Sequence, residues 1–343
     1  MRALALPLAA VLGLAVPLAA QGSGEAEWAE IDGKRVDLAR ERAAIEQFQS
    51  IDQRLQNVGW KLVRGNADFC DRVIPSIGLQ LQDMASYGSP AIARAALGLT
   101  RDFAVQTAAR GSPAALSGTL TANREIARLA WADPNEWDAG DRMDWQRLVT
   151  AHDLLDSALE RDSSVEIRFA DGGKAIIEPV DVCATRFELM GSGERAVADG
   201  ERVVIGIEFP AFAYEEPVFA GVVAHELAHN LLGHRAWLSK VGRKQRTIRR
   251  AEREADRLMP WIMANAGYDP AAAQEFMERW GPGNDGWIFR DRSHDGWDER
   301  AEFIAAEIPK IRALMASEGK ADWSVHFERE IDPARGADQF DRD

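Results

Sequence analysis

The chain has 343 residues, 46% of them hydrophobic, and a formal net charge of −14 at pH 7. This length and composition provide enough apolar side chains for a buried core and room for two modest domains, which excludes a chain that is disordered throughout. The acidic balance argues against a nucleic-acid-binding protein, which needs a basic face, and against adhesion to anionic lipid.

The first 22 residues have the layout of a secretory signal peptide. Arg2 precedes a run rich in alanine and leucine, and small residues follow at Ala20 and Gly22. The alternative is a retained membrane anchor, but the run contains Pro7 and Pro17 and is barely long enough to span a bilayer. We expect cleavage near residue 22, no membrane span in the mature chain, and a periplasmic or secreted protein.

The chain has two cysteines, Cys70 and Cys183. In an exported protein an even number of cysteines favours a disulfide, because the compartment is oxidising. Two buried free thiols are the alternative. We expect the Cys70–Cys183 disulfide.

Hydrophobic periodicity and turn residues predict helices and strands along the whole chain. Apolar residues recur at helical spacing within residues 35–65. Within residues 96–182, the segment 96–120 alternates between apolar and polar and turns at Gly111-Ser112-Pro113, and a later hairpin turns at Asp171-Gly172-Gly173. The other predicted elements are helices at 145–160, 216–236, 248–266 and 298–316 and a strand at 202–209.

The segment 224-AHELAHNLLGHR-235 carries three of the six histidines. On an α-helix, residues four apart share a face, so His225 and His229 can both face one ion. Zinc binds imidazole nitrogen well and prefers four tetrahedral ligands. Glu226 lies beside that face, where it can take a proton from a zinc-bound water as general base. A solvated histidine pair is the alternative.

A catalytic zinc site needs a third protein ligand. His234 lies nine residues after His225, about half a turn from the predicted metal-binding face, so we interpret it as structural. Downstream, Glu252 and Asp256 share one helical face, whereas Glu254 points away. One of the two carboxylates can bind the metal while the other orients a ligand, and a solvated acidic face is the alternative.

The motifs HELAHNLLGH, EREADR and AGYDP together resemble the zinc peptidase family that includes HtpX, BepA and the CAAX prenyl proteases. The resemblance covers about residues 185–316. It implies that His225, His229 and Glu252 bind one zinc ion per chain and that Asp256 orients a ligand from outside the coordination sphere. It also implies an α+β fold, with a mainly helical gluzincin-type metallopeptidase core and a small sheet.

The family often carries Ser-His-Pro before a helix, and 293-SHDGWDER-300 matches this pattern except that Asp295 replaces the proline. In some exported relatives that histidine caps the zinc and holds the enzyme latent. The resemblance therefore implies a role for His294 in latency or in the transition state. A histidine in a surface loop is the alternative.

Residues 96–182 resemble a bacterial PDZ domain. The segment ALGL (96–99) matches the carboxylate-binding loop and GSPAALSG (111–118) matches the turn that follows, although Asn123-Arg124 replaces the usual Gly-Asp. PDZ domains bind a peptide as an added strand, so the resemblance implies an inserted β-rich domain that selects substrates. A degenerate structural insert is the alternative. The disulfide would hold the two ends of an insert that closes at residue 182.

The expected domain order follows from these segments: signal peptide (1–22), helical segment packed on the core (23–95), PDZ-like insert (96–182), peptidase core (183–320) and charged tail (321–343). The expected function is that of a zinc-dependent endopeptidase acting on exported or envelope proteins, with quality control as the role that the resemblance implies. Its partners would be protein or peptide substrates, with the peptide extended along the strand at 202–209. The alternative is a catalytically silent periplasmic module that binds peptides or acts as a chaperone.

Overall fold

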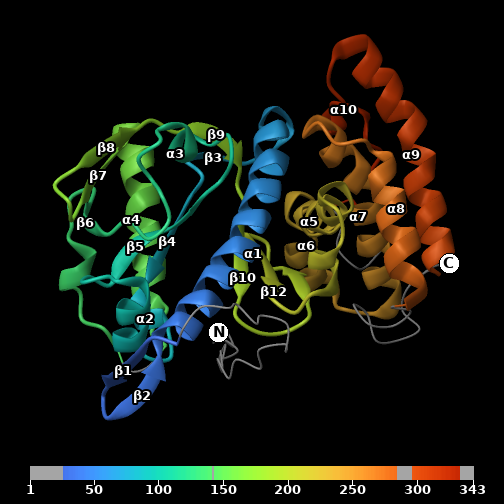
Figure 1. Cartoon of the computed structure of the whole chain (residues 1–343). Coiled ribbons are helices and arrows are strands. Elements are labelled where there is room, and N and C mark those ends of the chain that lie inside the picture. The colour runs from blue at the N-terminus through green and yellow to red at the C-terminus, as the bar shows by residue number, and fades with distance from the viewer. Residues whose placement is uncertain (1–25, 141–142, 284–295, 333–343) are drawn as a thin grey trace. The chain divides into compact units, whose positions relative to one another are not determined.

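A computed structural model describes residues 26–140, 143–283 and 296–332, which form a mixed α+β structure (Figure 1). The α+β class expected from the sequence is confirmed. The expected signal peptide, His294 and the end of the charged tail lie outside the described residues. The chain divides into two compact units. Unit 1 comprises residues up to Arg54, Pro75–Val180 and Met190–Ser192, and unit 2 comprises Leu55–Ile74, Asp181–Leu189 and residues from Gly193 onward.

Unit 1 consists of short strands and helices. Its strands form the antiparallel pairs β1-β2 and β4-β5 and the antiparallel sheet β6-β7-β8. Its elements are β1 (Trp28–Ile31), β2 (Lys34–Asp37), the first part of α1 (Leu38–Gly65), β4 (Leu79–Asp83), α2 (Pro90–Leu97), β5 (Phe103–Ala108), α3 (Pro113–Leu116), β6 (Ile126–Leu129), α4 (Gln146–Asp162), β7 (Val165–Phe169) and β8 (Lys174–Ile177).

The core of unit 1 lies between α4 and the strands β4 to β8, which run beside this helix in Figure 1. Helix α4 contributes Ala151, Leu155 and Leu159, which recur at helical spacing and are all buried. Alternate residues of β7 and β8 are buried against it, as expected for strands with one face toward a core. The predicted hairpin is confirmed, and Gly172 supplies the positive φ of +85° that its turn needs.

The segment that resembles a carboxylate-binding loop has a different local structure. In ALGL, Ala96 and Leu97 end α2, and Gly98 closes the helix in the left-handed conformation. The N–H of Gly98 donates to the carbonyl of Ala95, and the N–H of Leu99 donates to that of Arg94. Because these N–H groups complete the helix end, they are not available to a peptide carboxylate, which corrects this assignment.

The Cys70–Cys183 disulfide predicted from the sequence is confirmed. The two cysteines are 113 residues apart, and both belong to unit 2. The chain crosses between the units at β3 (Val73–Ser76) and β9 (Val180–Cys183), and these two strands pair with each other. The disulfide therefore closes a loop that contains most of unit 1.

Unit 2 is mainly helical and carries a small three-stranded sheet in the order β10-β12-β11. Its elements, after the end of α1, are β10 (Arg186–Met190), β11 (Ala196–Ala198), β12 (Arg202–Gly206), α5 (Glu216–Leu231), α6 (His234–Val241), α7 (Gln245–Asn265), α8 (Ala271–Trp280), α9 (Trp297–Glu318) and α10 (Trp323–His326). Short 3-10 helices in the whole chain are Ala67–Phe69, Met84–Ser86, Pro134–Glu136, Pro210–Ala213 and Gly281–Gly283.

Helix α5 is the central helix of unit 2. Every residue from Val218 to Ala228 is buried, so α5 has no solvent-exposed face over this stretch and is a core helix. Helices α7 and α8 pack against it, and α9 packs against both of them (Figure 1). Among the described residues, none of the helices combines the length and the apolar character that crossing a bilayer would require.

The helix expected at 216–236 is two helices. Gly233 has a φ of +68°, and its left-handed conformation separates α5 from α6. Glycine adopts this conformation without the steric penalty that a Cβ brings. The break matters for the site, because His234 begins a new helix and does not continue the face that carries His225 and His229.

Candidate metal centre

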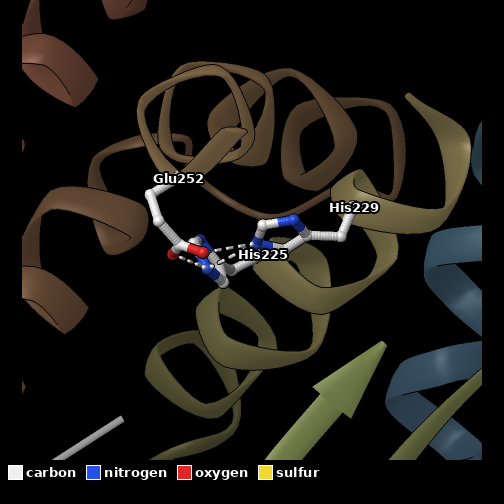
Figure 2. Close-up of side chains that lie close together, drawn as sticks. All are labelled: His225, His229 and Glu252. Atoms are coloured by element: carbon white, nitrogen blue, oxygen red, sulfur yellow. Dashed lines mark hydrogen bonds and ion pairs between the residues drawn. The ribbon is translucent and has the colours of Figure 1, made fainter. Parts of the chain in front are cut away.

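Three side chains from two neighbouring helices meet inside unit 2. His225 and His229 come from α5, one turn apart, and Glu252 comes from α7. Figure 2 shows the two imidazoles and the carboxylate pointing toward one another. One donor atom from each lies within 4.8 Å of the others, so this group can hold a metal ion. Among the described residues, this is the one set of three or more histidine, cysteine, aspartate or glutamate side chains placed closely enough to hold a metal ion.

The distances between the donor atoms fit a tetrahedral ion. Nε2 of His225 lies 3.2 Å from Nε2 of His229. Oε2 of Glu252 lies 3.4 Å from the first nitrogen, and its Oε1 lies 3.5 Å from the second. An ion such as zinc, with bonds of about 2.0–2.1 Å, places tetrahedral donors about 3.3–3.4 Å apart. Oε2 of Glu252 is buried and accepts no hydrogen bond, although Nε2 of His225 lies 3.4 Å and the guanidinium of Arg300 3.9 Å away. A buried carboxylate oxygen without a donor is costly unless a cation satisfies it.

The electrostatics of the group are those of tightly coupled imidazoles and carboxylates. Burial would lower the pKa of His225, but the carboxylates of Asp256 and Glu252 raise it to about 10. Burial would raise the pKa of Glu252, but the two histidines hold it well below its usual value. The surroundings of Glu252 therefore favour its negative, ionised form, because positive charge lies beside it. A bound cation would stabilise the same ionised form.

Asp256 contacts His225 at Nδ1, the ring nitrogen that faces away from His229 and Glu252. It lies one turn after Glu252 on α7, and its Oδ1 is 3.1 Å from Nδ1 of His225. Arg300 of α9 donates to both oxygens of Asp256, over 2.6 and 2.8 Å. Burial would raise the pKa of Asp256, but the charge of Arg300 and the contact with His225 keep it low. An ionised Asp256 at this distance favours the tautomer of His225 with its hydrogen on Nδ1, in which Nε2 is the nitrogen that can bind metal.

Glu226 lies next to the metal group without belonging to it. It is buried on α5, directly after His225. Burial raises its pKa, against the opposing effect of His225 and His229. It also accepts a hydrogen bond from the backbone N–H of Ala198 in β11. A carboxyl group with a raised pKa is better able to receive and return a proton near neutral pH.

The small sheet corrects the expected path of a bound peptide. The strand expected to hold it, β12, lies between β10 and β11 and is paired on both sides. A strand paired on both sides has no free edge for another strand. Strands β10 and β11 are the two outer strands, and the Ala198 N–H of β11 reaches Glu226. The free edge of β11, and not β12, therefore lies beside the candidate base.

A second buried cluster lies behind His229. His234 is buried, and its Nδ1 is 2.9 Å from Nδ1 of His229. Its Nε2 is 2.9 Å from Oε2 of Glu254, which also accepts from Arg329. Burial lowers the pKa of His234 to about 4, and the contacts with His234 and Arg329 hold the pKa of Glu254 at about 2 against the effect of burial. Neutral His234 therefore faces an ionised Glu254.

The structure thus brings together most, but not all, of the residues singled out from the sequence. His225, His229, Glu252, Glu226 and Asp256 converge on one place, whereas the residue expected to cap the site, His294, lies outside the described residues. Glu254, expected to point away from the face shared by Glu252 and Asp256, points to His234 in the cluster behind His229. No family model, curated protein or solved structure matches the chain in comparisons with known proteins.

Proposed function

We propose that the chain is a zinc-dependent endopeptidase. The observation that carries the proposal is the buried group of His225, His229 and Glu252, whose donor atoms have the spacing of tetrahedral zinc ligands. The resemblance of the HELAH and EREAD segments to the HtpX, BepA and CAAX prenyl protease family supports the choice of zinc and of peptide hydrolysis. The adjacent buried Glu226 supplies the proton-transfer group that hydrolysis needs.

The residues of the chain have separate roles in this mechanism. When bound, zinc acidifies water and polarises the carbonyl of the scissile bond. Glu226 takes a proton from the attacking water and later gives it to the leaving amine. Burial favours this shuttle, because it raises the pKa of Glu226. Asp256, held by Arg300, keeps His225 oriented with Nε2 toward the ion.

The substrate in this proposal is an extended segment of protein chain. An extended peptide would pair with the free edge of β11, where the Ala198 N–H already reaches Glu226. The disulfide of unit 2 supports an exported location, because such bonds persist in oxidising compartments. Selection of substrates by a PDZ-like unit 1, and quality control as the cellular role, remain proposals from the resemblance.

The Glu226→Gln variant tests the proposal in the mature chain. We expect it to keep its zinc and lose hydrolysis of an unfolded, fluorescently labelled protein by at least about 100-fold. Glu216→Gln, at the start of the same helix, is the matched control and should cleave at the wild-type rate. Cleavage by Glu226→Gln at the wild-type rate would exclude its role as base. A wild-type chain that holds zinc and binds the unfolded protein without cleaving it would favour the silent binding module.

A further inference from the structure

The cluster behind His229 forms a continuous chain of hydrogen bonds that ends at the metal group. It runs from Arg329 through Glu254 and His234 to His229. Arg329 follows the end of α10, Glu254 lies on α7, His234 on α6 and His229 on α5. The residues after α10 are called the C-terminal segment below. Glu254 and His234 have side-chain exposures of 0% and 1%, so the two middle residues of this series of hydrogen bonds are shielded from water.

The direction of each hydrogen bond follows from the chemistry of Glu254. Its Oε1 accepts from the backbone N–H groups of Glu330 and Ile331, over 2.8 and 3.1 Å, and from Nε of Arg329 over 3.2 Å. Its Oε2 accepts from Arg329 over 3.0 Å. All of these partners can only donate, so Glu254 is an acceptor throughout. Nε2 of His234, 2.9 Å from Oε2, therefore carries a hydrogen and donates it.

The tautomer of His234 then decides that of His229. The guanidinium of Arg329 already neutralises Glu254, so a second buried positive charge on His234 would have no counter-ion. A neutral His234 with its hydrogen on Nε2 has a free lone pair on Nδ1. That lone pair lies 2.9 Å from Nδ1 of His229, which must therefore carry the hydrogen. In neutral His229, Nε2, which faces His225 and Glu252, is then the unprotonated nitrogen.

We propose that His234 and Glu254, held by Arg329, are positioning residues that fix His229 as the Nδ1–H tautomer and so keep its Nε2 available to the metal. The two histidine ligands are thus oriented in different ways. His225 has a carboxylate in direct contact, that of Asp256, whereas His229 receives the same support through an intervening imidazole. Arg329 also donates to the carbonyl of Leu232, at the end of α5, which makes the C-terminal segment part of the site.

This inference rests on the metal site of the proposed function but not on peptide hydrolysis. Its test is a long-range ¹H–¹⁵N correlation spectrum of the mature chain with ¹⁵N-labelled histidine, stripped of metal and recorded near neutral pH. We expect a protonated Nδ1 on His229 and a protonated Nε2 on His234. A wild-type spectrum with the hydrogen of His229 on Nε2 would overturn the proposal, whatever the stability of any variant.

The Glu254→Gln variant should reverse the chain of hydrogen bonds. Three donors hold the oxygen at the Oε1 position, so the amide nitrogen would face His234 and donate to its Nε2. His234 would then carry its hydrogen on Nδ1, and His229 would carry its own on Nε2. We expect this tautomer switch in the spectrum and a 10- to 100-fold weaker zinc affinity, measured by competition with a chelator, which is about the effect of losing such an outer partner.

Glu307→Gln is the matched control. Glu307 is also a buried carboxylate paired with an arginine, Arg257, and it accepts from Trp261, but no imidazole contacts it among the described residues. We expect wild-type tautomers and a zinc affinity within about twofold of wild type. An equal loss of affinity in both variants would show general loosening and overturn the proposal. Wild-type tautomers as expected, with no zinc bound, would overturn the proposed function and leave the tautomer assignment supported.

Discussion

Removing the Cys70–Cys183 disulfide should destabilise unit 2 by an amount that depends on whether the two units unfold together. The bond closes a loop across 113 residues of sequence. If the whole loop is disordered in the unfolded state, the chain-entropy relation gives a stabilisation of about 5 kcal/mol. The Cys70→Ser and Cys183→Ser double variant should lose most of that free energy of unfolding.

The stabilisation by the disulfide is smaller if unit 1 stays folded when unit 2 unfolds. Residues 75–180 of the loop belong to unit 1, and the strands at the two crossings, β3 and β9, are paired. If unit 1 stays folded while unit 2 unfolds, its two ends remain close and the flexible loop shortens to roughly 10 residues, for which the same relation gives about 3 kcal/mol. The size of the loss therefore reports whether unfolding is concerted.

Guanidinium denaturation of the chain without residues 1–22, followed by far-UV circular dichroism and tryptophan fluorescence, measures the difference. The wild type with reductant should match the double serine variant, and reductant should not change the double variant. A double variant within about 1 kcal/mol of the oxidised wild type would refute the reasoning. It would mean that the bond does not restrict the unfolded chain.

Three further predictions concern single residues. Asp256→Asn would place an amide N–H against either His225 or the donors of Arg300. Zinc affinity, measured by competition with a chelator, should therefore fall 10- to 100-fold. An unchanged affinity would contradict the role of Asp256 in orienting His225. Burial raises the pKa of Asp83 from 3.8 to about 6. The folded chain therefore binds more protons than the unfolded chain between those values, and this carboxyl group's contribution to stability falls as the pH rises through that window. The unfolding free energy of Asp83→Asn relative to wild type should rise by about 2 kcal/mol from pH 4 to pH 6, and a difference independent of pH would exclude the shift. The Cβ that Gly233→Ala adds would meet no atom within 4 Å, but the residue would keep a φ of +68°. Denaturation should therefore show a free energy of unfolding lower by about 1 kcal/mol, from backbone strain alone. An unchanged free energy of unfolding would mean that the backbone between α5 and α6 can relax to another conformation.

The metal group was predictable because its information is local. His225 and His229 are one helical turn apart, as are Glu252 and Asp256, and each pair lies within one helix. Spacing alone then places each pair on one face. Which carboxylate faces the two histidines depends on how α7 packs against α5, and the resemblance, not the spacing, singled out Glu252.

The support of His229 was not predictable, because it depends on contacts between distant parts of the chain. Arg329 is 75 residues from Glu254, and no local pattern pairs them. The path of the chain at His234 depends on the left-handed Gly233. A glycine after an apolar helical run is a common helix end, so this one signal was present in the sequence and would have separated α5 from α6.

The order of strands in the small sheet also could not be predicted from the sequence. An alternating apolar run such as β12 indicates a strand, but it does not tell a central strand from an edge strand. Strand β11 has only three residues, Ala196–Ala198, too few for a periodic signal. Only the pairing of the folded chain shows that β11 is the outer strand beside Glu226.

The most direct test of the proposed metal site is the metal content of the purified chain without residues 1–22, measured by mass spectrometry for the wild type and for Glu252→Gln. We predict about one zinc ion per wild-type chain and little or none in the variant, because the third ligand is lost. A wild-type chain without zinc, even after zinc is supplied, would contradict the account. The convergence of His225, His229 and Glu252 would then be a buried cluster of imidazoles and a carboxylate that binds no metal.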